Sequence, residues 1–136
     1  MKGYRGYISG GTINGNLIPQ RIQNLTLKSY AEKNQLSLLM AAAEYNFNHS
    51  TIILNGIFEE ANNVDGFIFY SIWQIPPLPN VHKKIQELIE NHKLTFHFAL
   101  ENKTVNTLSE WILLEDYFMI KELSLRTPNI INKIFS

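Results

Sequence analysis

The chain contains no cysteine, carries no net charge and has no long apolar run. Without cysteine there can be no disulfide framework, thiolate metal site, cysteine nucleophile or iron–sulfur cluster. Twelve basic residues balance twelve acidic ones, so no general positive field favours nucleic acid or an anionic membrane surface. No segment approaches the roughly 18 apolar residues of a membrane-spanning helix, and the first seven residues, MKGYRGY, lack the apolar part of a signal peptide. These absences favour a cytoplasmic protein that binds no nucleic acid and does not insert into membranes.

The residues that are present predict one globular domain over 1–136. A chain of 136 residues that is 45% hydrophobic can bury a core but rarely divides into two domains. Four short apolar segments alternate with four segments of helical periodicity. We expect strands over 3–9, 36–42, 67–73 and 94–100, and helices over 19–34, 50–62, from 80 onwards and over 107–123.

This alternation of strands and helices is typical of the α/β class. Right-handed crossovers would give a mostly parallel four-stranded sheet with helices on both faces, a three-layer sandwich of the flavodoxin-like kind with its core over 3–102. Helical spacing predicts the inward-facing residues of the first three helices. They are Ile22, Leu25, Ser29 and Tyr30; then Ile53, Leu54, Ile57, Phe58 and Ala61; then Val81, Ile85, Leu88 and Ile89.

The last helix has almost no polar face. A helix that is apolar all round is normally buried all round, and a four-stranded domain cannot enclose it alone. Its acidic residues argue against a membrane-associating helix, which would carry Lys or Arg along its polar edge. We therefore expect a homo-oligomer with 107–136 at the interface. The apolar residues are Trp111, Ile112, Leu113, Leu114, Tyr117, Phe118, Met119 and Ile120.

A candidate site follows from the rule that open parallel sheets bind ligands beyond the carboxyl ends of their strands. Strand alternation also predicts that Arg5, Tyr7 and Ser9 share one face, as do His97, Ala99 and Glu101. The polar residues expected at the strand ends, besides the glycine loop 10–15, are Ser9, Glu44, Tyr45, Ser71, Gln74 and Glu101.

Each of these groups has two interpretations. The glycine loop could hold a phosphate or form a plain turn. Arg5 could clamp a carboxylate or phosphate, or pair with Glu44 or Glu101. His97 could be an acid–base group or a core histidine, and the two glutamates could be paired carboxylates or helix caps. The four histidines show no metal-ligand spacing and no cofactor motif is present, so neither a metal nor a cofactor is expected.

The sequence around these residues resembles two protein families. Gly6-Tyr7-Ile8-Ser9, Gln23-Asn24-Leu25 and Val64-Asp65-Gly66 before Phe69-Tyr70-Ser71 resemble the catalytic domain of serine recombinases over residues 3 to about 100. The family pattern would place arginine at Ser9 and the serine nucleophile at Gly11, and no basic DNA-binding tail follows. The resemblance therefore implies a resolvase-like fold without strand-transfer activity.

The second resemblance covers nearly the whole chain. The segments KGYRGYIS (2–9), PQRIQNLTLKSYAEKNQL (19–36), AEY (43–45), DGFIFYSIWQIP (65–76) and FHFALEN (96–102) resemble sporadic carbohydrate cluster proteins. Their genes lie among those for bacterial surface-glycan and lipopolysaccharide biosynthesis, which implies a role in that pathway.

We expect an enzyme that acts on an activated or acidic sugar. Arg5 would hold a carboxylate or phosphate, and Glu44 or Glu101, with His97, would move a proton. Amides, hydroxyls and phenols suit sugar hydroxyl groups, and the positions assigned to them are Tyr7, Ser9, Gln20, Gln23, Tyr45, Ser71 and Gln74. The alternative is a non-catalytic module that binds a sugar or a pathway enzyme; DNA processing lacks both a nucleophile and a basic tail.

Overall fold

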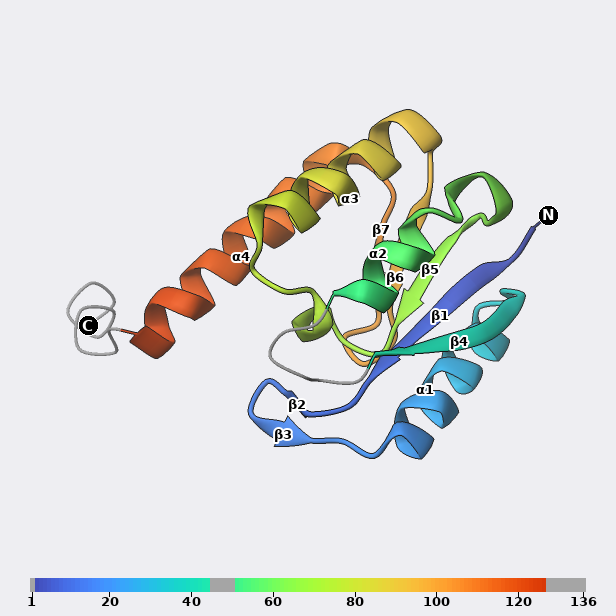
Figure 1. Ribbon diagram of the computed structural model, residues 1–136, viewed down its shortest axis with the longest axis horizontal. Helices are drawn as coiled ribbons and strands as arrows, with labels where there is room; N and C mark the ends of the chain where they lie inside the picture. Colours follow the sequence, from blue (N-terminus) through green and yellow to red (C-terminus); the bar gives the residue numbers. More distant parts are fainter. Residues whose placement is uncertain (1, 45–50, 127–136) are drawn as a thin grey trace.

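The computed structural model of the chain describes residues 2–44 and 51–126. The elements follow the predicted alternation closely, with a small hairpin and a seventh strand added (Figure 1). In chain order they are β1 (Tyr4–Ser9), β2 (Thr12–Ile13), β3 (Asn16–Leu17), α1 (Gln20–Lys33), β4 (Leu38–Glu44), α2 (Ile52–Phe58), η1 (Ala61–Asn63), β5 (Gly66–Phe69), η2 (Ile72–Gln74), α3 (Pro79–His92), β6 (Thr95–Phe98), β7 (Lys103–Val105) and α4 (Leu108–Arg126).

The main sheet has five strands in the order β4-β1-β5-β6-β7. The first four are parallel, and β7 runs antiparallel to β6. The predicted α/β class and mostly parallel sheet are therefore confirmed, whereas the expected count of four strands is wrong. The fifth strand escapes sequence reasoning because it is only three residues long and two of them, Lys103 and Thr104, are polar and exposed.

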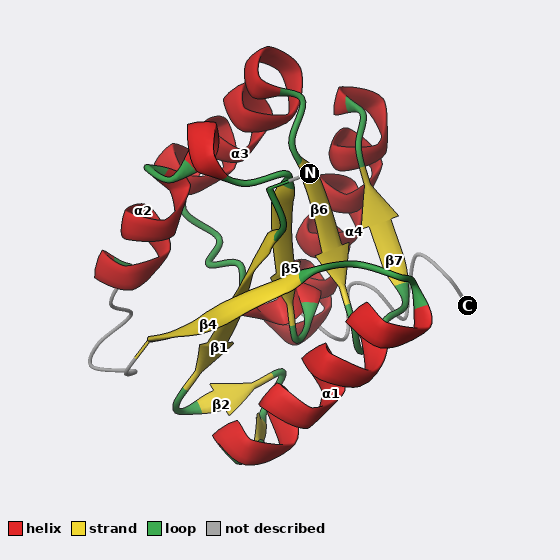
Figure 2. Ribbon diagram, turned by 90° about the vertical axis from the view of Figure 1, so that its right-hand side faces the viewer, coloured by secondary structure: helices red, strands yellow, loops and turns green. Residues whose placement is uncertain are grey.

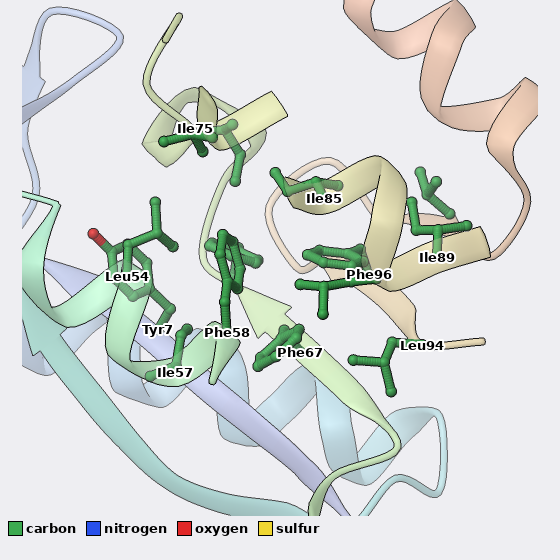
Figure 3. Close-up of a cluster of buried hydrophobic side chains, with 14 of the residues drawn as sticks. Tyr7, Leu54, Ile57, Phe58, Phe67, Ile75, Ile85, Ile89, Leu94 and Phe96 are labelled. Carbon is green, nitrogen blue, oxygen red and sulfur yellow. The ribbon is translucent and has the colours of Figure 1, made fainter. Parts of the chain in front are cut away.

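Helices lie on both sides of this sheet, with α1 on one side and α2, α3 and α4 on the other (Figures 1 and 2). The core on the α2–α3 side is built on aromatic rings: Phe58 lies 5.5 Å from Phe67, and Phe67 lies 5.3 Å from Phe96, between ring centroids. Figure 3 shows these rings between the strands and the two helices. The inward faces predicted for α2 and α3 are confirmed, since Ile53 is partly buried against the core and Leu54, Ile57, Phe58, Ala61, Val81, Ile85, Leu88 and Ile89 are all buried.

The face of α1 that points into the core is rotated by about one residue from the predicted face. Ile22 and Leu25 are 46% and 52% exposed. Ser29 is also exposed, and of the predicted residues Tyr30 alone is buried, together with Gln23, Leu27 and Ala31. Hydrophobic spacing alone misplaces the face because a polar residue, Gln23, is drawn inward by hydrogen bonds to the strand ends, as described below.

Strand β4 lies at the edge of the sheet, not in its interior as its unbroken apolar sequence suggests. Its pairing with β1 slips between Arg5 and Tyr7, where Met40 and Ala41 oppose the single residue Gly6. This β-bulge turns Met40 outward, 85% exposed. As a result, Ala41 lies on the same side of the sheet as Leu38, the side that α1 covers.

Two further details differ from expectation. The glycine loop forms the β2–β3 hairpin, whose Asn14-Gly15 turn has positive φ at both residues (51° and 82°), the geometry that Asn-Gly favours in two-residue hairpins. The third predicted strand ends at Phe69, and the chain then turns through η2 instead of continuing to Trp73.

Helix α4 begins with the predicted cap, in which the Glu110 N–H donates to Thr107 Oγ1 at 3.2 Å. Trp111 is fully buried, but Ile112, Leu113 and Tyr117 are 47%, 70% and 49% exposed. The side chains of Phe118, Met119 and Ile120 lie outside the described ones. In Figure 1 the helix continues past the end of α3, away from the sheet. None of the helices in the described part of the chain combines the length and apolarity needed to cross a bilayer.

Candidate functional site

A cavity of about 280 Å³ lies at the carboxyl ends of β1, β4 and β5. Strand β1 pairs with β4 on one side and β5 on the other. The connection from β1 leads to α1 on one face of the sheet, whereas those from β4 and β5 lead to α2 and α3 on the other face. Such a switch point is where open α/β sheets bind ligands. We call this cavity the strand-end pocket; it is lined by Tyr7, Ser9, Gly10, Thr12, Ile13, Glu44, Thr51, Leu54, Trp73, Gln74, Ile75, Pro76 and Pro77.

Glu44 supplies the carboxylate of this pocket and also caps a helix. It is 3% exposed. Its Oε1 accepts hydrogen bonds from the Tyr7 hydroxyl (3.1 Å) and the Leu54 N–H (3.1 Å), and Oε2 accepts one from the Ile53 N–H (3.0 Å). The two N–H groups belong to the first turn of α2, which no residue of α2 itself can satisfy. Burial, followed by the negative charge of Glu44, raises the pKa of the Tyr7 phenol, so Tyr7 stays a hydrogen-bond donor.

Three polar side chains beside the pocket, those of Ser9, Gln23 and Gln74, form a network with one another and with nearby backbone groups. Gln23, which is fully buried, donates to the carbonyls of Ser9 (2.7 Å) and Ile18 (2.9 Å) and accepts from the Ser9 N–H (2.9 Å). Gln74 donates to Ser9 Oγ (3.0 Å) and Gln23 Oε1 (3.1 Å) and accepts from the Ser71 N–H (3.1 Å). This amide network ties the ends of β1 and β5 to α1. Among its members, only Ser9 and Gln74 line the pocket.

Arg5 lies away from the pocket, near the amino end of β1. Its Nε is 2.9 Å from Glu60 Oε2, and Nη1 donates to the Met40 carbonyl at 2.7 Å. The guanidinium therefore holds the carbonyl of the β4 bulge, and it pairs with neither Glu44 nor Glu101.

Glu101 and Ser71 meet, but outside the strand-end pocket. Glu101 accepts from the Ser71 hydroxyl (2.7 Å) and from the Ile72 N–H (3.0 Å), so it caps η2. It faces a second cavity of about 560 Å³, which we call the α4 groove. Trp73 lines both cavities. The other residues of the α4 groove are Ile72, Lys103, Thr104, Val105, Glu110, Leu113, Leu114 and Tyr117.

His97 occupies the opposite side of the sheet, under α1. Its Nδ1 lies 2.9 Å from the Tyr30 hydroxyl and 3.1 Å from Thr104 Oγ1, and the Tyr4 ring packs edge-on at 5.0 Å. Within the described part of the chain, its buried Nε2 has no hydrogen-bond partner. Burial lowers the pKa of the imidazole from 6.5 to about 4. His97 is therefore a neutral side chain of the core, bonded to Tyr30 and Thr104 and not to the carboxylates with which it was expected to act.

This burial makes stability depend on pH. Between pH 6.5 and 4 the unfolded chain binds a proton at His97 that the folded chain does not, so stability falls as the pH drops through this window. The loss amounts to up to about 3 kcal/mol. Urea unfolding of the wild type and of His97→Phe from pH 7 to 4.5 measures it. The wild type should lose more stability than the variant; parallel curves would contradict the assignment.

Two of the predicted site positions, Gln20 and Tyr45, remain. Gln20 is half-buried at the start of α1 and does not line the strand-end pocket, and Tyr45 lies outside the described residues. The glycine loop expected at the strand end does contribute Thr12 to the pocket. Sequence reasoning missed the pocket residues Thr51 and Trp73, which nothing in the sequence marks.

The pocket can offer hydroxyl groups, one amide, one carboxylate and an indole ring to a ligand. These groups suit a polyhydroxylated molecule whose ring lies against Trp73. Among the described residues, no three His, Asp or Glu side chains lie close enough together to hold a metal ion.

The chain matches no protein-family model, and no curated protein matches it.

Proposed function

We propose that the strand-end pocket binds a sugar, in a cytoplasmic step of bacterial surface-carbohydrate biosynthesis such as lipopolysaccharide, capsule or O-antigen assembly. The observation that carries the proposal is the convergence of Ser9, Thr12, Thr51 and Gln74 on a cavity bounded by Trp73 at the switch point of the sheet. The pathway comes from the sequence resemblance to sporadic carbohydrate cluster proteins, and the resolvase-like, three-layer description of the fold is part of the same proposal.

A ligand titration tests the binding. Neutral sugars, nucleotide sugars, sugar phosphates and 3-deoxy-ulosonic acids are screened by thermal shift. A ligand that binds the folded state raises the melting temperature with concentration. Thr12→Arg, which fills the pocket from an exposed strand position, should weaken a bound ligand at least tenfold.

Two matched variants complete this test. Asn16→Arg adds the same charge to the other strand of the hairpin, outside the pocket, and Arg5→Ala removes a cation that the pocket does not contain; both should bind as the wild type does. A ligand lost on Arg5→Ala but kept on Thr12→Arg would place the site elsewhere, and a panel without any hit would remove the proposal.

In the catalytic form of the proposal, Glu44 moves a proton of the sugar and Tyr7 holds the carboxylate in place. Glu44 is the carboxylate of the pocket, whereas Glu101 and His97 face other parts of the molecule. Glu44→Gln should abolish glycan production while ligand binding persists. Because Glu44 also caps α2, the variant's unfolding must be measured beside it: loss of production with loss of fold would not support catalysis.

A second candidate is a non-catalytic module that recruits a partner through α4. Ile112, Leu113 and Tyr117 are exposed beside the α4 groove, and we propose that this surface also mediates self-association. Leu113→Lys, at a position that is 70% exposed, should then lower the mass in solution without lowering stability.

A further inference from the structure

We infer that the strand-end pocket takes a single sugar ring that presents hydroxyl or amino groups, and that it discriminates against rings that carry phosphate or carboxylate. The inference rests on the proposed function, because it names the class of sugar that the same pocket would bind. It departs from the acidic sugar expected from the sequence, since Arg5, the cation expected to hold such a group, pairs with Glu60.

Glu44 gives the pocket a negative charge. Of the described residues that line the cavity, it is the one that carries a charge, and it is 3% exposed. The segment 45–50, which connects Glu44 to Thr51, contains neither lysine nor arginine. A carboxylate shielded from water acts on nearby charges more strongly than it would in bulk water, because the effective dielectric constant is lower. A second anion in the cavity would therefore be repelled, and an ammonium group would be attracted.

The helix starts at these strand ends are already occupied by carboxylates of the chain. The N–H groups at the start of a helix are a common place for α/β proteins to hold phosphate. At α2, which follows β4, the N–H groups of Ile53 and Leu54 donate to the carboxylate of Glu44. At η2, which follows β5, the Ile72 N–H donates to Glu101 Oε1 at 3.0 Å. A phosphate at either position would have to displace a carboxylate that the fold itself supplies.

The hydrogen bonds inside the fold also use up donors that a phosphate would need. Gln74, the side-chain amide of the pocket, donates to Ser9 Oγ (3.0 Å) and to Gln23 Oε1 (3.1 Å), which accounts for both of its N–H groups. Tyr7 donates its hydroxyl to Glu44, so its oxygen is left to accept. The other hydroxyls of the lining can either donate or accept. Ligand groups that donate, such as hydroxyls and amines, complement this lining better than phosphate or carboxylate oxygens, which only accept when ionised.

The size of the cavity limits what enters it. Its volume of about 280 Å³ lies at the small end of ligand pockets, which run from roughly 300 to 1,000 Å³. Trp73 supplies an aromatic surface for one sugar ring. A charged group on the ring itself would enter the cavity, whereas a nucleotide attached to the ring would remain outside. The inference therefore concerns the substituents of the ring.

The affinities of matched sugars test the inference on the wild-type chain. Glucose, glucosamine, glucuronic acid and glucose 6-phosphate share one ring and differ in charge, and their galactose counterparts repeat the comparison with another stereochemistry. Calorimetric titration at one ionic strength and about pH 6.5, where amines carry a proton, gives each dissociation constant. Glucosamine should bind at least as tightly as glucose, and both anionic sugars should bind about tenfold more weakly or worse.

The two ways in which this test can fail are distinct. An anionic sugar that binds as tightly as its neutral counterpart would overturn the inference and leave the sugar-binding proposal standing. If no sugar of either series binds, the proposed function falls and the inference falls with it.

Glu44→Gln tests whether the charge of Glu44 causes the discrimination. The variant should still bind glucose, should bind glucosamine more weakly, and should bind the anionic sugars nearly as well as glucose. Glu101→Gln is the matched control, because it makes the same change in the carboxylate that caps η2, outside the pocket; it should discriminate as the wild type does. Urea unfolding of both variants shows whether each is folded, and the wild-type series decides the inference if Glu44→Gln is not. Folded variants with equal selectivity would contradict the role of Glu44.

Discussion

Replacing Gln23 with leucine is expected to lower the free energy of unfolding by about 3 kcal/mol. The two residues have similar volumes, but leucine makes none of the hydrogen bonds that Gln23 makes to Ser9, Ile18 and Gln74. A buried polar group that loses its partner costs more than the bond itself contributes. Equilibrium urea unfolding followed by circular dichroism gives the difference.

Gln20→Leu is the matched control on the same helix. Gln20 is half-buried and outside the amide network, so the same substitution there should change stability by no more than about 0.5 kcal/mol. If the two variants unfold alike, the network does not stabilise the junction of β1, β5 and α1. The control thereby separates hydrogen bonding from the general cost of losing a glutamine in α1.

Gly66→Ala is expected to be at least as damaging, with a loss of about 3 kcal/mol or more. Gly66 begins β5, in the interior of the sheet, and lies opposite Thr95 of β6. A methyl group added here would overlap the Thr95 carbonyl, which is backbone and cannot rotate away. Relief would require separating two paired strands. Thermal or urea unfolding measures the effect, and a variant that fails to fold agrees with it.

Gly56→Ala should act in the opposite direction. Gly56 lies within α2, and a methyl group there would meet nothing within 4 Å. Since glycine is costly inside a helix, the variant should gain about 0.5–1 kcal/mol. A neutral Gly66→Ala beside a stabilised Gly56→Ala would show that β5 and β6 can move apart without cost.

The elements themselves could be predicted because their signals are local. The faces of α2 and α3 follow from apolar spacing alone, as does the alternation of strands and helices that defines the class. The α1 face could not be predicted in this way: Ile22 and Leu25 are exposed, and Gln23 is buried with partners from the end of β1 and from η2. Strand β4 misleads for a related reason, since an apolar segment at a sheet edge resembles one in the interior.

The strand-end rule located a pocket but assigned too many residues to it. Tyr7, Ser9, Glu44 and Gln74 do lie together in the pocket. Arg5, His97 and Glu101, which were also expected there, lie elsewhere in the structure. Arg5 sits too early in β1, His97 points through the opposite face of the sheet, and Glu101 follows a turn in which strand alternation no longer holds.

The sequence by itself determined the α/β class, the order in which strands and helices follow one another along the chain, and the identity of most core residues. These features could be read from it because periodicity and turn residues act over a few positions. Only the tertiary structure decided which strand is the edge, which polar groups share a cavity and which carboxylates cap helices. Those outcomes depend on hydrogen bonds and contacts between residues that lie tens of positions apart, such as Ser9 with Gln74 and Ser71 with Glu101. Spacing along a single chain carries no signal of such pairs.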